Sequence, residues 1–227
     1  MEYKGENNLN IMNLAKNYND FLLDMVCKNA PHGVSSILDF GAGEGVFAAL
    51  MEKKLNVPVY SLEPAENMQK YYTSAPLQRL SELGRTKIDY IYSLNVLEHI
   101  ENDKEIVDSF YDALAPQGSV FLYLPAFPCL YSSVDKQVGH CRRYVKKDVK
   151  RLFDSRKWVI QEVKYADFLG WFLAFLFKCV EKKDGKIPAD KLKIYDKYFF
   201  PISAFLDKVT FGKLLGKNII IRIRKKL

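Results

Sequence analysis

The chain has few cysteines, and none of them forms a recognisable pair. Its 227 residues contain four, at positions 27, 129, 141 and 179, without a Cys-x-x-Cys motif. Such isolated thiols are typical of a reducing compartment and argue against a disulfide framework or a cysteine zinc site. We therefore expect no structural metal and no disulfide.

Long apolar runs are also missing. The longest, Phe168 to Phe177, has ten residues, about half of the roughly 20 that a membrane-spanning helix needs. The first eight residues, MEYKGENN, lack the basic and apolar parts of a secretory signal. These absences predict a cytoplasmic location without a transmembrane span.

Positive charge is scarce in the first part of the chain and abundant in the second. The formal net charge is +7. Residues 1–140 carry 11 basic and 18 acidic side chains, whereas residues 141–227 carry 23 basic and 9 acidic ones. A basic region attracts polyanions such as nucleic acid, phosphorylated substrates or an anionic membrane. The alternative is a solvated lysine-rich face without a partner.

The hydrophobic pattern alternates short β-rich runs with helical ones, which predicts an α/β fold. We expect an N-terminal helical segment at 1–34, an α/β core at 35–166, a helical insertion at 167–216 and a final core strand at 217–227. The expected strands are residues 35–40, 57–63, a weak one at 77–80, 87–95, 119–124, 158–165 and 218–224. The expected helices are residues 46–54, 64–72, 103–114 and 144–153.

A glycine-rich turn follows the first expected strand. The sequence Asp39-Phe40-Gly41-Ala42-Gly43-Glu44-Gly45 leads into a helix, so backbone N–H groups can approach a ligand there. A dinucleotide fingerprint Gly-x-Gly-x-x-Gly would need Gly or Ala at Val46, which disfavours a pyrophosphate. Glu63, after the second strand, can accept both hydroxyls of a ribose. In the alternative, Asp39 caps the loop and Glu63 is a surface acid.

Four blocks resemble the class I S-adenosylmethionine-dependent methyltransferases and occur in the family order. They are ILDFGAGEG, SLEPAENM, IYSLNVLEHI and LAPQGSVFLYLP, which together span Ile37 to Pro125. The resemblance implies a Rossmann-like, mostly parallel sheet of seven strands with the last antiparallel, and S-adenosylmethionine as cofactor. The cofactor-binding residues it implies are Asp39, Gly41, Ala42, Gly43, Gly45, Glu63 and Asn95, with Glu63 on the ribose and Asn95 near the sulfonium. The adenine contact stays open, with Ser81 or Glu82 as candidates.

The residues after the 87–95 strand bear on the methyl acceptor. The sequence Asn95-Val96-Leu97-Glu98-His99 differs from the Asn-Pro-Pro-aromatic motif of nucleic-acid amino methyltransferases, so nucleic acid is disfavoured. Glu98 and His99 are candidates for catalysis or for capping and packing at a helix start. Cys129, in an apolar context, is expected to be buried.

A polar loop at residues 131–144 is expected over the cofactor, because loops at the carboxyl ends of strands form the active crevice. It resembles the Asp…Gly-His-x-Arg-Arg-Tyr signature of a bacterial methyltransferase subgroup associated with surface-glycan or lipid-linked pathways. We interpret His140 as a general base for a hydroxyl acceptor, since an imidazole ordinarily titrates near pH 6.5. The other candidate catalytic residues are Asp135, which would orient His140, Arg142 and Arg143, which would clamp an anionic acceptor, and Tyr144. The alternative is a purely structural loop.

The apolar run in the insertion has several interpretations. Phe168, Trp171, Phe172, Phe175 and Leu176 recur at helical spacing, which predicts a core-facing stripe. The other faces are also apolar and lysines flank the run. The pattern is therefore equally compatible with a membrane interface, a site for a hydrophobic substrate or a dimer contact.

The sequence thus predicts a cytoplasmic, peripherally membrane-associated S-adenosylmethionine-dependent methyltransferase. Its expected acceptor is an oxygen of a small or lipid-linked molecule, such as a glycan intermediate. Two alternatives remain: a non-catalytic adenosyl-ligand or membrane module, and a nicotinamide-dependent reductase, which Val46 disfavours.

Overall fold

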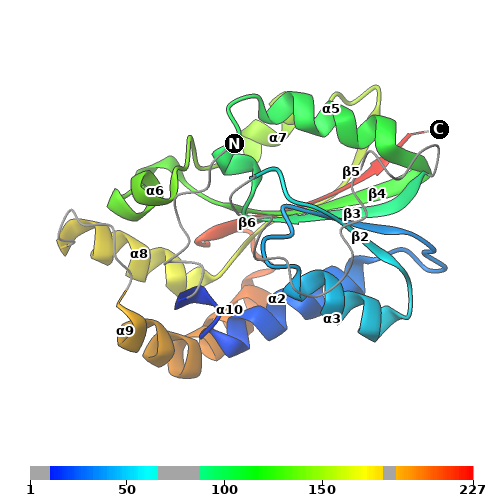
Figure 1. Ribbon diagram of the computed structural model, residues 1–227. Coiled ribbons are helices and arrows are strands. Elements are labelled where there is room, and N and C mark those ends of the chain that lie inside the picture. The colour runs from blue at the N-terminus through cyan, green and yellow to red at the C-terminus, as the bar shows by residue number, and fades with distance from the viewer. Residues whose placement is uncertain (1–10, 66–86, 181–187, 227) are drawn as a thin grey trace.

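The protein is a three-layered α/β structure (Figure 1). The computed structural model describes residues 11–65, 87–180 and 188–226. Helices α5 (Asp103–Ala113) and α7 (Lys146–Leu152) cover one face of a central sheet. Helices α2 (Lys16–Asn29), α3 (Val46–Leu55) and α10 (Phe200–Thr210) cover the other.

The sheet confirms the α/β expectation. Its strands are β1 (Ile37–Phe40), β2 (Val59–Leu62), β3 (Ile88–Leu94), β4 (Leu114–Pro125), β5 (Trp158–Ala166) and β6 (Asn218–Lys225). Their order is β2-β1-β3-β4-β6-β5. The first four are mutually parallel, and β6 runs antiparallel between β4 and β5. These are the six strands of the described residues; the expected strand at 77–80 and most of the expected helix at 64–72 lie outside them.

Strand β4 begins earlier than the sequence predicted. We expected helix to Leu114 and strand only from Ser119, but α5 ends at Ala113 and Leu114 already pairs with Ile88. The register then shifts, because Tyr90 pairs with Ser119. Residues 115–118 therefore form an irregularity within the strand, with Gln117 at a φ of 63°.

Both faces of the sheet are buried, as is typical of parallel strands between helices. All four residues of β1 are buried. On one side Val107 and Phe110 of α5 join the core, and on the other side α2 contributes Tyr18, Leu22 and Val26, spaced four residues apart. This spacing places the three side chains on one helix face.

The described residues between β5 and β6 are largely helical. The helices are α8 (Phe168–Val180), α9 (Ala189–Ile194), a π-helical turn η4 (Tyr195–Phe199) and α10. Pro201 does not interrupt this segment, because it lies in the first turn of α10, where its missing N–H has least effect. The Asp207 carboxylate fixes the start of α8 by accepting hydrogen bonds from the backbone N–H of Asp167 and Phe168, at 2.6 and 3.0 Å.

The predicted core-facing stripe of α8 is wrong for three of its residues. Phe172 and Phe175 are each 41% exposed and Leu176 is 58% exposed, because the main contacts of α8 are with α10 and η3 (Pro128–Leu130). Helix α10 adds Phe205, at 63% exposure. In the described part of the chain, no helix is long and apolar enough to cross a membrane.

One buried carboxylate links η4 to the beginning of α2. Asp196 is 5% exposed and accepts hydrogen bonds from the backbone N–H of Asn17 at 3.0 Å and of Tyr18 at 2.8 Å. Its own carbonyl accepts a bond from Asn17 Nδ2 at 2.9 Å. These N–H groups belong to the first turn of α2, which has no intrahelical acceptor for them.

We expect Asp196→Ala to lower the free energy of unfolding by about 2–3 kcal/mol, because two N–H groups lose a charged acceptor. Urea titration measures this change, with Asp190→Ala as the control because Asp190 is exposed on neighbouring α9. Equal stability of the two variants would contradict the role of Asp196.

Candidate active site

A cavity of about 610 Å³ opens at the carboxyl ends of the parallel strands. In open α/β sheets ligands bind at this edge. The structure brings most of the predicted site residues to the cavity wall: Asp39, Gly41, Ala42, Gly43, Glu63, Asn95, Asp135, His140 and Arg143. Gly45, Arg142 and Tyr144 are not in its lining.

The glycine loop requires its glycines. Gly41, Gly43 and Gly45 have φ angles of 86°, 56° and 76°, in the left-handed region that L-residues with a Cβ avoid. A Cβ on Gly41 would lie 2.1 Å from Cγ2 of Val96. Gly45 then caps the N-terminus of α3, which leaves the loop backbone next to the cavity.

Glu63 connects the glycine loop to the end of β2. Its Oε2 accepts a hydrogen bond from Gly43 N at 2.7 Å, and Oε1 accepts one from Ala65 N at 2.8 Å. Burial raises the pKa of Glu63, although both N–H groups oppose the shift. A carboxylate oxygen can accept more than one hydrogen bond, which suits a ligand with two adjacent hydroxyls.

Asp39 and Asn95 lie deeper in the same cavity. Asp39 ends β1 at 3% exposure, and burial raises its pKa to about 7. Asn95 follows β3 with a φ of 54°, and its N–H donates to the carbonyl of Tyr123 at 2.8 Å. Its Oδ1 accepts a weak bond from Asn218 Nδ2 at 3.4 Å, which ties the wall of the cavity to β6.

Asp135, on helix α6 (Ser133–Val138), organises the polar loop. Its carboxylate is 1% exposed, accepts two hydrogen bonds from Arg143, at 3.0 and 2.9 Å, and caps α6 through Ser132 N at 2.8 Å. Oδ1 also lies 2.6 Å from His140 Nδ1. Burial alone would raise the pKa of Asp135, but His140 and Arg143 lower it to about 2. The carboxylate is therefore ionised and accepts the Nδ1 proton of His140.

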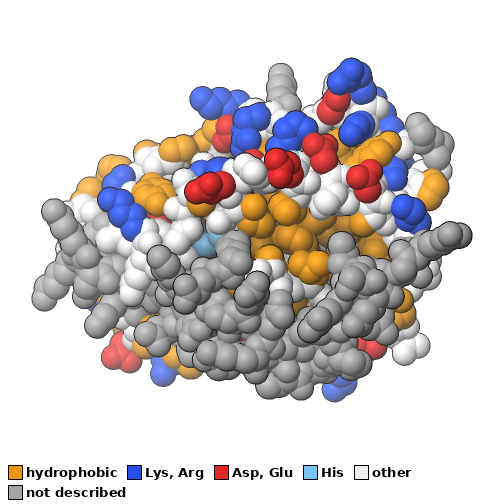
Figure 2. Space-filling view, turned by 45° about the horizontal axis from the view of Figure 1, so that its top comes forward, with side chains coloured by type: hydrophobic (Ala, Val, Ile, Leu, Met, Phe, Trp, Pro, Cys, Tyr) orange, Lys and Arg blue, Asp and Glu red, His pale blue; other side chains and the backbone are white. Residues whose placement is uncertain are grey.

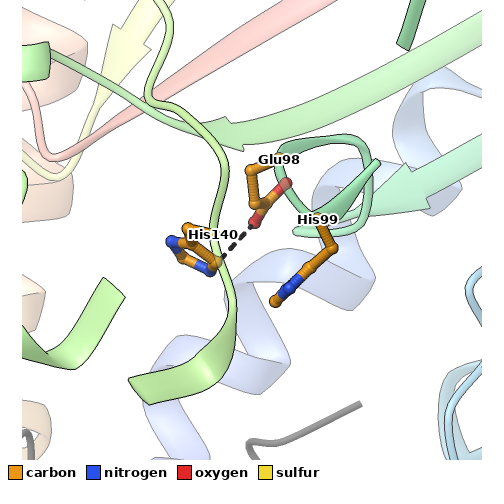
Figure 3. Close-up of side chains that lie close together, drawn as sticks. All are labelled: Glu98, His99 and His140. Carbon is orange, nitrogen blue, oxygen red and sulfur yellow. Dashed lines mark ion pairs between the residues drawn. The ribbon is translucent and has the colours of Figure 1, made fainter. Parts of the chain in front are cut away.

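His140 faces Glu98 across the edge of the cavity (Figure 3). With the proton on Nδ1, its Nε2 carries the free lone pair, and this atom lies 3.7 Å from Glu98 Oε1. The ring of His99 meets that of His140 edge-on, with 4.6 Å between centroids. Glu98 and His99 belong to the 3-10 turn η2 (Leu97–His99), before α5 begins at Asp103.

Burial dominates the titration of this pair. It raises the pKa of Glu98, whose side chain is fully buried, to about 7. Burial, reinforced by neighbouring His140, lowers the pKa of His99 to about 4. No sequence pattern indicated that Glu98 would lie close to His140. Its adjacency to His99 was the available signal.

Arg142 and Tyr144 lie on the other side of the loop from the cavity. Arg142 forms an ion pair with Asp103 at 2.7 Å, and the Tyr144 hydroxyl donates to the same carboxylate at 3.1 Å. Arg151 adds a bidentate contact at 3.0 and 2.8 Å. Although burial opposes the shift, Arg151 and Arg142 lower the pKa of Asp103. Asp103, which sequence reasoning missed, therefore anchors the loop to α5.

None of the four cysteines lines the cavity, although the Cys141 thiol lies 3.6 Å from the carbonyl of His99. All four are free, and Cys129 is exposed in η3, so the expectation of a buried thiol is wrong. On the face shown in Figure 2, acidic and basic side chains are interspersed above a cluster of hydrophobic ones. The basic excess of the chain therefore forms no continuous positive patch on the visible part of this face.

Comparisons with known proteins identify the class. Residues 13–163 match the family described as methyltransferase domain. A malonyl-[acyl-carrier protein] O-methyltransferase of Calditerrivibrio nitroreducens is 24% identical over 160 residues, which are 69% of this chain and 59% of that protein. The match thus spans less than two thirds of this relative.

Solved structures share the fold. A S-adenosylmethionine-dependent methyltransferase of Archaeoglobus fulgidus has a TM-score of 0.54 and 15% identity over 91% of this chain and 94% of its own. Phosphoethanolamine N-methyltransferase 2 of Haemonchus contortus, in complex with S-adenosyl-L-methionine, has a TM-score of 0.54 and 16% identity over 90% of this chain and 51% of its own.

The chain belongs to the methyltransferase-domain family. Its Rossmann-like sheet has the class I fold that these S-adenosylmethionine-dependent methyltransferases share.

Proposed function

We propose that this enzyme methylates an oxygen of a small or lipid-linked acceptor, with glycan intermediates among the candidates. The observation that carries the proposal is the orientation of His140. Asp135 holds its Nδ1, so the free lone pair is on Nε2, and His140 lines a cavity that is also lined by the glycine loop and Glu63. The O-methyltransferase relative is consistent with an oxygen acceptor.

In the proposed reaction, Glu63 binds the ribose hydroxyls and the glycine loop accommodates the methionine end of the cofactor. Asn95 lies near the sulfonium. The acceptor hydroxyl gives its proton to Nε2 of His140, and its oxygen attacks the methyl carbon in line with the sulfur. The S–CH₃ bond breaks, its electron pair stays on sulfur, and S-adenosylhomocysteine and a methyl ether form. Most of the rate enhancement comes from positioning, since the sulfonium is already a good leaving group.

We expect Glu63→Ala to weaken S-adenosylhomocysteine binding roughly tenfold to a hundredfold, because two hydrogen bonds to a charged acceptor are lost. Calorimetric titration measures the affinity. Glu52→Ala, exposed on α3, is the matched control and should bind like wild type. Wild-type affinity in Glu63→Ala would contradict the ribose assignment.

Label transfer from [methyl-³H]S-adenosylmethionine into lipid and glycan extracts tests the acceptor and the base. We expect base-stable label, as in a methyl ether, and a loss of about 100-fold or more in His140→Asn. His32→Asn is the control, because His32 is exposed and outside the cavity lining. Base-labile label would indicate a carboxylate acceptor, and undiminished transfer by His140→Asn would exclude His140 as the base.

The apolar surface of α8 and α10 supports a lipid-linked acceptor presented at a membrane. Leu176 and Phe205 are 58% and 63% exposed, and Lys178 and Lys208 lie on the same two helices. An apolar face with flanking lysines favours an anionic interface.

We expect the protein to float with anionic vesicles at low salt and to dissociate as salt rises. The double change Leu176→Ser and Phe205→Ser should weaken binding about tenfold or more. Ile160→Ser is the control, because Ile160 is also exposed, at 43%, but lies on β5. Absence of wild-type flotation at low salt would overturn the membrane proposal.

A further inference from the structure

Three side chains that can ligate a metal converge at the rim of the cavity. Glu98 and His99 come from η2, and His140 comes from the residues after α6 (Figure 3). One ligand atom of each lies within 4.8 Å of the other two. His99 and His140 also line the cavity, so an ion between them would be reachable from it.

The Glu98 carboxyl oxygens lack hydrogen bonds within the described residues. The residue is 0% exposed. A buried carboxyl without hydrogen bonds is strongly unfavourable. The nearest ring nitrogen, Nε2 of His140, is 3.7 Å away, beyond ordinary hydrogen-bond distance. A cation beside the carboxyl would supply the missing partner.

His140 is oriented as metal-binding histidines are. Its Nδ1 donates to the carboxylate of Asp135 at 2.6 Å, and Arg143 fixes that carboxylate in turn. A carboxylate on one ring nitrogen selects the tautomer and makes the other nitrogen a better ligand. The free nitrogen is the one that faces Glu98.

The spacing also suits a cation. Two ligand atoms about 2.1 Å from a tetrahedral ion are about 3.4 Å apart, close to the 3.7 Å between Glu98 Oε1 and His140 Nε2. Two imidazoles and one carboxylate, with one position open, form a common catalytic zinc set. We propose that Glu98, His99 and His140 bind a divalent transition-metal ion of the zinc type, with the open position directed to the cavity.

This inference rests on methyl transfer in the same cavity, and it specifies how an oxygen acceptor is activated there. The lone pair on Nε2 of His140 cannot bind a cation and accept a proton simultaneously. In the metal-loaded enzyme the cation therefore takes the place of His140 as the group that activates the hydroxyl. In the loaded enzyme the cation binds the acceptor hydroxyl and lowers its pKa. The proton leaves to solvent, and the same oxygen then forms the O–CH₃ bond as the S–CH₃ bond breaks.

Cobalt(II) is the probe for the site, because its visible absorption reports coordination number and ligands. The titration uses tag-free protein in a Cys141→Ser background, since the Cys141 thiol is exposed beside His140. We expect one equivalent of cobalt to bind, with an absorption spectrum typical of four- or five-coordinate cobalt(II). Zinc should then displace the cobalt. Glu98→Gln should weaken binding at least tenfold, and His32→Asn should bind like the background protein.

Calorimetry with S-adenosylhomocysteine on the same samples separates the two proposals. Glu98→Gln should keep the affinity of the background protein, which also shows that the variant is folded. Cofactor binding without cobalt binding in the background protein would overturn the metal site and leave methyl transfer intact. Equal cobalt affinity of Glu98→Gln and the background would also overturn it. Cobalt binding without cofactor binding would support the metal site and count against the proposed function.

Discussion

The arrangement of the active site depends on the ion pair between Asp135 and Arg143. Both side chains are nearly buried, at 1% and 9% exposure, and a buried pair is costly unless its remaining hydrogen-bonding capacity is used. Here it is used: Asp135 also caps α6 and binds His140, and Arg143 donates to the carbonyl of Ala126 at 3.2 Å. The tautomer of His140, and so the chemistry available at Nε2, follows from this pair.

The geometry of the glycine loop and Glu63 was predictable because its determinants are local. Three glycines at alternate positions between a strand and a helix require positive φ angles, which the structure has. Glu63 follows the neighbouring parallel strand, so its carboxylate reaches Gly43 at the same sheet edge. In both cases a short stretch of sequence determines the geometry, and parallel pairing brings the stretches together.

The acceptor half was only partly predictable, because its contacts join distant segments. Asp135 and His140 are only five residues apart in the chain, and the contact expected between them is present. Nothing in the sequence indicated that Glu98 would face His140. Arg142 and Arg143 are adjacent and equivalent by sequence, yet one binds Asp103 on α5 and the other Asp135. The exposure of α8 stayed one of several open alternatives for a similar reason, since periodicity identifies a helix face but not its neighbour.

Strand β6 has a consequence for how the molecule reaches this structure. It pairs with β4 on one side and with β5 on the other. The strand that connects β5 to the rest of the sheet therefore comes after α8, α9 and α10 in the chain. Until β6 arrives, the β4 edge, with Leu122 and Leu124, has no partner on that side. Such long-range pairing is slow and exposes apolar strand edges to neighbouring molecules. Closure of the sheet is therefore a late folding event that competes with aggregation.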